Sequence, residues 1–407
     1  MEPRLDCTVC RPTVSIVLFL RGHRYRFMRT RLALVASSLV LAGACSSSTS
    51  SYSSSSPAAA SASRTALSSP TVSAHADLGQ FAAIYGSGMG GQSLAVVGSD
   101  GSLHGQVSQL GRFGGDVVPP FASTTNDATY YLNGNGLMRL QPGGTPVHIR
   151  DLPGSSSVRV AFAVSPDDKR IAIATLTSAP TSSSPSPDVP KYLGMKLFVE
   201  DLDGSNHVDI FSSTTVAEWP VGWHGSDLVI AVGAGLYGFG GSLTPYPYFA
   251  FDGIHVADST TGRRTATLCA GLPAVGLATS RGVLCAKTNG LGPTITTPVA
   301  MALSDWSGKE TDLGVSCIYG GLQPAGDDIA CDTNSGGFVM SPDGAEQPLP
   351  TPSTGPDPYN LVCWVGHDHL LLTSRYVGAV LYDIAARTTQ QLDIRADMSV
   401  GAIPGGF

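Results

Sequence analysis

One stretch of the chain, residues 158–214, limits the fold more than any other feature of the sequence. It contains VRVAFAVSPDDKRIAIAT and, after a Ser/Pro-rich interruption, MKLFVEDLDGSNHVDIF. Alternating apolar residues separated by Asp, Gly and Pro turn formers are typical of short antiparallel strands, and this stretch predicts four of them. A four-stranded meander of this size cannot bury both of its faces alone. The stretch therefore predicts further copies of itself alongside.

Hairpins of the same kind recur along the chain. Six more alternating strands end in a turn and a second strand, at residues 94–102, 137–145, 254–263, 300–309, 337–345 and 379–388. Before six of the seven hairpins lies an apolar strand, a polar turn and a second apolar strand, beginning near residues 119, 160, 218, 274, 317 and 361. The pattern predicts an all-β, seven-bladed β-propeller of four-stranded antiparallel blades, with six or eight blades as the alternatives.

The first hairpin is incomplete, because only one strand, residues 81–85, precedes it. Residues 398–407 contain the strand-like segment SVGAI. We expect this C-terminal strand to join the N-terminal blade and to close the ring, because closure removes free sheet edges.

The segment SPDDKRIAIA, residues 165–174, resembles the Ser-Pro-Asp-Gly-Lys-x-Ile-Ala signature of TolB-like, WD-related β-propeller repeats. This resemblance implies a propeller domain. In that signature Asp167, Asp168 and Lys169 are turn residues of the scaffold, and no chemistry is assigned to them.

The N-terminal region has the layout of an export signal. Arg29 and Arg31 follow Met28, residues 32–44 are apolar, and Cys45 comes next. Leu-Ala-Gly-Ala-Cys, residues 41–45, resembles a bacterial lipobox, although the family pattern prefers Leu at the position of Ala42. This resemblance implies cleavage before Cys45 and lipidation of Cys45; an ordinary secretory signal is the alternative. We expect a signal region over 1–44, with Met28 as the true start, a Ser/Ala/Pro tether over 45–75, and the propeller over 76–407.

The charge distribution limits the classes of partner that the protein is expected to bind. Of the net charge of −7, residues 1–44 carry +5, which leaves −12 for the rest. An acidic domain argues against nucleic-acid binding, so we expect the membrane to be contacted only through the lipid anchor. The predicted location is the outer face of the cell membrane, and the predicted partner is a protein, peptide or glycan of the cell envelope.

Five cysteines follow Cys45, and export to an oxidising space permits disulfides. We expect Cys317 to bond to Cys331 from neighbouring first and second strands of one blade. Cys269 and Cys285 flank a short excursion between the fourth and fifth blades and form the second predicted pair. Cys363 is expected to be a buried thiol beside Trp364.

Familiar catalytic motifs are absent from the sequence. It contains no Gly-x-Ser-x-Gly nucleophile elbow, no His-Glu-x-x-His zinc helix and no phosphate-binding glycine loop. The histidines His224, His367 and His369 fall in predicted turns, where we interpret them as solvated side chains rather than metal ligands. We therefore assign no catalytic residue, no metal and no cofactor.

Three long insertions separate the second and third strands of consecutive blades, at residues 176–194, 233–252 and 289–298. The middle insertion carries six aromatic residues among Gly and Pro: Tyr237, Phe239, Tyr246, Tyr248, Phe249 and Phe251. Such residues suit stacking on sugars or capture of an extended peptide, whereas an inward fold that plugs the ring is the alternative. We expect a binding or scaffolding module. The alternative is a propeller enzyme of the lyase, cyclotransferase or glycoside hydrolase type acting on envelope or extracellular substrates.

Overall fold

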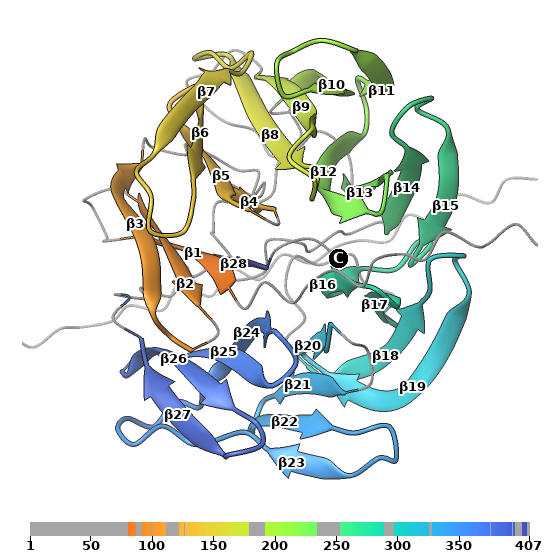
Figure 1. Ribbon diagram of the computed structural model, residues 1–407. Helices are drawn as coiled ribbons and strands as arrows, with labels where there is room; N and C mark the ends of the chain where they lie inside the picture. The colour runs from red at the N-terminus through yellow and green to blue at the C-terminus, as the bar shows by residue number, and fades with distance from the viewer. Residues whose placement is uncertain are drawn as a thin grey trace, which may run out of the picture. The chain divides into compact units, whose positions relative to one another are not determined.

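The computed structural model describes residues 80–86, 92–98, 100–110, 122–125, 127–178, 192–233, 253–288, 297–324, 328–374, 376–392, 394 and 401–404. All of them belong to the compact unit Ser68–Phe407. They contain strands and turns but no helix, and the strands form seven four-stranded antiparallel sheets (Figure 1). We number these sheets 1 to 7 in the order in which the chain enters them.

The first four sheets contain β1 to β15 and, in sheet 1, also the last strand β28. Sheet 1 contains β1 (Gln80–Gly86), β2 (Gln92–Gly98), β3 (Leu103–Leu110) and β28 (Gly401–Pro404). Sheet 2 contains β4 (Ala122–Thr124), β5 (Thr129–Asn133), β6 (Gly136–Leu140) and β7 (Val147–Asp151). Sheet 3 contains β8 (Val158–Val164), β9 (Arg170–Ser178), β10 (Tyr192–Asp201) and β11 (Val208–Ser213). Sheet 4 contains β12 (Ala217–His224), β13 (Asp227–Gly233), β14 (Ile254–Asp258) and β15 (Arg264–Leu268).

Three further sheets follow. Sheet 5 contains β16 (Ala274–Thr279), β17 (Gly282–Ala286), β18 (Val299–Ser304) and β19 (Glu310–Cys317). Sheet 6 contains β20 (Tyr319–Leu322), β21 (Ile329–Thr333), β22 (Gly336–Met340) and β23 (Glu346–Pro348). Sheet 7 contains β24 (Asn360–Val365), β25 (His369–Ser374), β26 (Gly378–Asp383) and β27 (Thr388–Gln391).

Sheets 2 to 7 are simple meanders, because consecutive strands are neighbours in each of them. Sheet 1 differs, since the strand order is β28-β1-β2-β3 and the strand nearest the C-terminus pairs with β1. The register places Ala83 opposite Ala402 and Ile84 opposite Gly401. Both ends of the described chain thus contribute to one sheet.

Short Asp-x-Ser turns connect the third strand to the fourth in sheets 1, 3 and 5. In the turn after β10, the carboxylate of Asp203 accepts hydrogen bonds from the backbone N–H and the hydroxyl of Ser205, at 2.8 and 2.6 Å. Asp100 and Asp305 accept the same pair of bonds from Ser102 and Ser307. These bonds favour the charged carboxylate and hold the pKa of all three Asp residues below its ordinary value. Such local contacts explain why the hairpins are recognisable in the sequence.

The hydrophobic core lies between neighbouring sheets. One buried cluster joins sheets 2 and 3 and includes Tyr130, Leu152, Phe162 and Ile171. Another joins sheets 7 and 1, since it unites Ala95 and Val97 of β2 with Val362 and Leu371. Each fully buried large apolar side chain contributes about 1.5–3 kcal/mol. The repeated sheets therefore stabilise one another, as the recurrence of the hairpins predicts.

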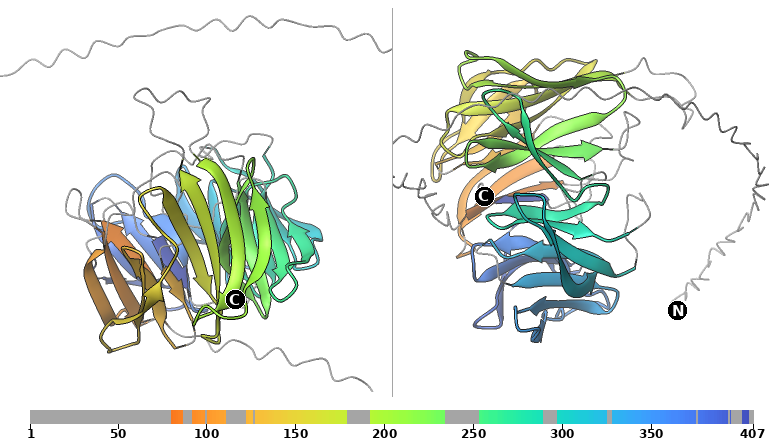
Figure 2. Two further views of the ribbon diagram at one scale, coloured as in Figure 1. Left: turned by 90° about the horizontal axis from the view of Figure 1, so that it is seen from above. Right: turned by 90° about the vertical axis from the view of Figure 1, so that its right-hand side faces the viewer.

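The first strand of each sheet, with β28 taking this place in sheet 1, lies innermost (Figure 1). The innermost strands contact one another in the order β28, β4, β8, β12 and in the order β16, β20, β24, β28. Seen from the side, strands of neighbouring sheets run alongside each other (Figure 2). We call the sheet ends where the chain passes to the next sheet the junction face, and the opposite ends the turn face.

The all-β class and the four-stranded antiparallel sheets expected from the sequence are confirmed. No helix in the part of the chain that the structure describes is long and apolar enough to cross a membrane.

Candidate functional site

The three long insertions leave the sheets at the junction face. They connect β9 to β10, β13 to β14 and β17 to β18, in sheets 3, 4 and 5. In an up-and-down meander, the connection from the second to the third strand lies at the same end as the link to the next sheet. The described strand ends that flank the three connections therefore all lie at the junction face.

The six aromatic candidates of the middle insertion, Tyr237, Phe239, Tyr246, Tyr248, Phe249 and Phe251, lie outside the described residues, and so does Cys45. The structure does describe the two strand ends that flank this insertion: β13 ends at Gly233, and β14 begins at Ile254. These ends are joined directly, since the N–H of Val232 donates to the carbonyl of Gly253 at 3.1 Å.

A buried charged cluster lies beside these strand ends. Glu218, at the start of β12, pairs in register with Val232, and its side chain is only 1% exposed. Arg264 donates to Glu218 Oε1 at 2.6 Å, and His255 Nδ1 lies 3.2 Å from the same oxygen. The Arg264 guanidinium also lies over the ring of Phe211 in sheet 3, 4.9 Å from its centroid. The cluster thus joins three strands of sheet 4 to the neighbouring sheet.

Sequence reasoning missed this cluster. Glu218 stands in an otherwise apolar strand, which is the one local sign of a paired buried charge. Its partners come from β14 and β15, so only the sheet register could identify them. Within the described residues Glu218 Oε2 has no hydrogen-bond partner.

The structure contains both predicted disulfides. Cys269 bonds to Cys285 and Cys317 bonds to Cys331, with Cα atoms 5.3 and 5.4 Å apart. Cys363 is a buried free thiol, as expected. The predicted pairing is confirmed.

The predicted strand assignment of Cys317 was wrong. Cys317 is the last residue of β19, the outermost strand of sheet 5, and the first strand of sheet 6 begins at Tyr319. The chain bends at Ile318. Because Ile318 is apolar, the sequence pattern gives no sign that one strand ends before it and another begins after it. The bond therefore joins two sheets rather than two strands of one sheet.

The two disulfides occupy equivalent places. Cys269 follows the outermost strand β15, Cys317 ends the outermost strand β19, and each bonds to the second strand of the next sheet. At other junctions an apolar side chain stands directly after the outermost strand: Leu152, Leu349 and Leu392, all buried. Each disulfide thus takes the place of an apolar contact between consecutive sheets.

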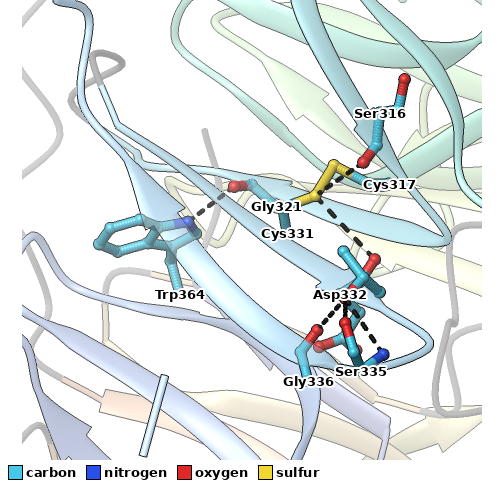
Figure 3. The surroundings of a disulfide bond; sticks show 9 residues. Ser316, Cys317, Gly321, Cys331, Asp332, Ser335, Gly336 and Trp364 are labelled. Atoms are coloured by element: carbon cyan, nitrogen blue, oxygen red, sulfur yellow. Dashed lines mark hydrogen bonds between the residues drawn. A yellow bond between two sulfur atoms is a disulfide. The ribbon is translucent and has the colours of Figure 1, made fainter. Parts of the chain in front are cut away.

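Asp332 adjoins the second disulfide. It follows Cys331 in β21 (Figure 3). The Asp332 Oδ2 atom accepts a hydrogen bond from the N–H of Leu361 in sheet 7 at 2.7 Å. Burial raises its pKa to about 7. Nearby, Trp364 of sheet 7 donates from Nε1 to the carbonyl of Gly321 in sheet 6 at 2.8 Å (Figure 3). This carboxyl group changes charge near neutral pH, but its contact is to backbone between two sheets.

The histidines that were weighed as metal ligands lie in different sheets. His224 ends β12 in sheet 4 and stacks on Trp306 of sheet 5, whereas His367 and His369 lie at the turn of sheet 7. His369 Nε2 is 3.8 Å from Asp383 Oδ2. Among the residues that the structure describes, no three His, Cys, Asp or Glu side chains are placed to hold a metal ion. His224 and the sheet 7 histidines are therefore not brought together.

Comparison with known proteins reaches the level of fold. No family model and no curated protein matches the sequence. Among solved structures, an oligogalacturonate lyase in complex with manganese is 12% identical, with a TM-score of 0.47, over 71% of this chain and 81% of that one. The oligogalacturonate lyase of Vibrio parahaemolyticus is 11% identical, with a TM-score of 0.47, over 70% of this chain and 81% of that one.

The acylaminoacyl peptidase of Pyrococcus horikoshii is 10% identical, with a TM-score of 0.48, over 75% of this chain and 48% of that one. This chain thus spans about half the length of the peptidase. At such low identity the similarity concerns the fold alone.

Proposed function

We propose that the protein is an exported, lipid-anchored, closed seven-bladed propeller that binds a partner on its junction face. The sheets 1 to 7 are the seven blades, and the pairing of β28 with β1 closes the ring. The two disulfides favour an oxidising location outside the cytoplasm. Lipidation of Cys45 and cleavage of the signal region are part of the proposal.

The observation that carries the binding role is that the strand ends flanking three long connections all lie at one face. The connections leave consecutive blades from Ser178, Gly233 and Ala286. One disulfide joins the second and third of these blades, and another joins the third to the blade that follows, so covalent bonds support the strand ends that hold two of the connections. A rigid scaffold that carries variable connections is the usual arrangement of a binding surface. We propose the aromatic residues of 234–252 as its contacts with a glycan or an extended peptide.

The buried carboxylates favour binding over catalysis. Glu218 is held by Arg264 and His255, and Asp332 by the N–H of Leu361. Both groups serve contacts within or between sheets and are shielded from solvent, whereas an acid or base must reach its substrate within hydrogen-bond distance.

The test exchanges all six aromatic residues of the middle connection for Ser and compares proteins captured from envelope extract and glycans bound on an array. A matched control deletes residues 180–189, a segment rich in Ser and Pro, from the connection between β9 and β10, whose flanking strand ends lie at the same face. We expect the aromatic variant to lose the partner and the control to retain it. Identical partners for the wild type and the aromatic variant would contradict the proposal.

A propeller enzyme is the second candidate, and the names of the similar structures agree better with it than with a binding module. The same preparations, incubated with oligogalacturonate and with envelope polysaccharides in the presence and absence of Mn²⁺, would decide between them. Shortened or unsaturated products formed by the wild type would replace the binding role with a catalytic one.

A further inference from the structure

The boundary between sheet 4 and sheet 5 differs from the other boundaries of the proposed ring. All other neighbouring innermost strands, such as β8 with β12 and β16 with β20, contact each other over several residues. Among the described residues, β12 and β16 approach each other least. Sheets 4 and 5 share a buried cluster that includes Trp223 and Val283, but their inner strands, the part of a sheet that lies closest to its neighbours, contact each other least.

On the junction face a disulfide crosses this boundary. Cys269 follows the last strand of sheet 4, and Cys285 lies in the second strand of sheet 5. The two residues are 1% and 0% exposed. Solvent therefore reaches these sulfurs only when the protein opens locally or unfolds.

On the turn face an aromatic stack crosses the same boundary. The His224 ring of sheet 4 lies on the Trp306 ring of sheet 5, with centroids 3.9 Å apart and planes inclined by 9°. Trp306 Nε1 donates to the carbonyls of Thr279 and Ser280, both at 3.0 Å, which fixes the indole on sheet 5. The stack therefore depends on the distance between the two sheets.

We propose that the ring opens at the boundary between sheets 4 and 5, and that the Cys269–Cys285 disulfide and the His224–Trp306 stack keep it closed. Opening separates these two sheets as units, while the hydrogen bonds within each sheet persist. Proteins open locally where native contacts are fewest. Because β13–β14 and β17–β18 lie on the two sides of this boundary, opening also changes the relative position of two of the three long connections. The inference rests on the ring and not on the proposed binding role.

The second disulfide provides a matched comparison. Cys331, like Cys285, is 0% exposed, lies in the second strand of its sheet and bonds to the end of the preceding outermost strand. The bonded cysteines are 16 residues apart in the first bridge and 14 in the second. The two bridges therefore restrict the unfolded chain nearly equally. The two bridges differ in the boundary that each one crosses and in the backbone of Cys269, which has a φ of 51°.

The experiment measures how fast a freed buried thiol reacts with a maleimide in the native protein. The variant Cys269→Ala frees Cys285, and Cys317→Ala frees Cys331; the native free thiol Cys363 reports global unfolding in both. We expect Cys285 to react at least about tenfold faster than Cys331, relative to Cys363, because local opening exposes it. Adding His224→Ala should accelerate Cys285 and leave Cys331 unchanged. Equal rates, or a faster Cys331, would overturn the proposal.

A second measurement needs no cysteine variant and so does not depend on their folding. The wild type is treated with dithiothreitol under native conditions, and the order in which the two disulfides are reduced is determined by peptide mapping. Reduction of Cys269–Cys285 first, with a further acceleration in His224→Ala, is the expected result. Reduction of Cys317–Cys331 first would refute a preferred opening between sheets 4 and 5. Neither outcome depends on whether a partner is bound, so the failure of this inference is distinguishable from failure of the binding role.

Discussion

At the scale of the residue, Asp332 shows how a polar side chain serves a contact between sheets. It lies in a buried strand, and its carboxyl oxygen accepts a hydrogen bond from the N–H of Leu361 in the next sheet. Without this bond the N–H of Leu361 would be buried without a partner. The cost of this arrangement is the desolvation of a carboxyl group, which raises its pKa from 3.8 to about 7.

This raised pKa makes stability depend on pH with a definite sign. Between pH 3.8 and about 7 the folded protein holds a proton on Asp332 that the unfolded chain has lost, so the contribution of this group to stability falls as pH rises through that range. Asp332→Asn keeps an oxygen acceptor and removes the titration. We expect the variant to lose less stability than the wild type between these pH values and to be at least as stable at high pH. Denaturant unfolding over a pH series measures this difference.

The control for the hydrogen bond is Asp332→Ala, which leaves the N–H of Leu361 without an acceptor. Compared with Asp332→Asn, which also lacks the titration, we expect it to cost about 1–3 kcal/mol at every pH. A pH dependence in Asp332→Asn equal to that of the wild type would contradict the role given to burial.

At the scale of the element, the turn between the third and fourth strands packs on the preceding sheet. In sheet 4, Gly262 has a φ of +70°, and a Cβ at this position would lie 2.8 Å from the carbonyl oxygen of Asp209 in sheet 3. The Gly308 turn of sheet 5 approaches the carbonyl of Thr267 in sheet 4 in the same way. These turns therefore need glycine for their backbone conformation and also for close contact with the neighbouring sheet.

A pair of substitutions separates these two requirements. Gly143 occupies the corresponding turn of sheet 2 with a similar φ of +68°, but a Cβ added there would meet nothing within 4 Å. We expect Gly143→Ala to cost about 1 kcal/mol, from the strained backbone alone. Gly262→Ala should cost at least about 1 kcal/mol more, because the backbone of sheet 3 must also move. Thermal unfolding compares the two; an equal cost would show that the contact contributes little.

The elements that the sequence predicts are those whose signals are local. Asp203 and Ser205 form their turn within three residues, so alternation and turn chemistry locate the hairpin. Glu218 is different, because its partners Arg264 and His255 are brought to it by the register of four strands. The place of Cys317 was misread because a one-residue bend separates two strands of different sheets. Prediction failed where a contact depends on how sheets are arranged rather than on neighbouring residues.

At the scale of the whole molecule, the contacts between sheets 7 and 1 support the proposal that the sheets form a closed ring. A Cβ on Gly101 of sheet 1 would lie 2.4 Å from Nε2 of Gln390 in sheet 7. Leu392 and Ile394 share a buried cluster with Ala95 and Val97 of sheet 1. With the pairing of β28 and β1, these contacts place the last sheet beside the first. The sequence predicts a closed ring because the first hairpin lacks one strand, and closure remains part of the proposal.

Closure predicts a specific covalent bond. Ala83 of β1 lies opposite Ala402 of β28, and directly opposed residues in antiparallel strands have Cα atoms close enough for a disulfide. We expect Ala83→Cys combined with Ala402→Cys to form a bond on mild oxidation, identified by non-reducing peptide mapping. The control combines Ala83→Cys with Ile403→Cys, because residues one step apart in register point to opposite faces of the sheet. The bond should also slow unfolding in denaturant, because both terminal strands of the unit would then be held in one sheet. A bond formed equally well in the control would mean that the C-terminal strand is not held in this register, and an open ring would then be the better description.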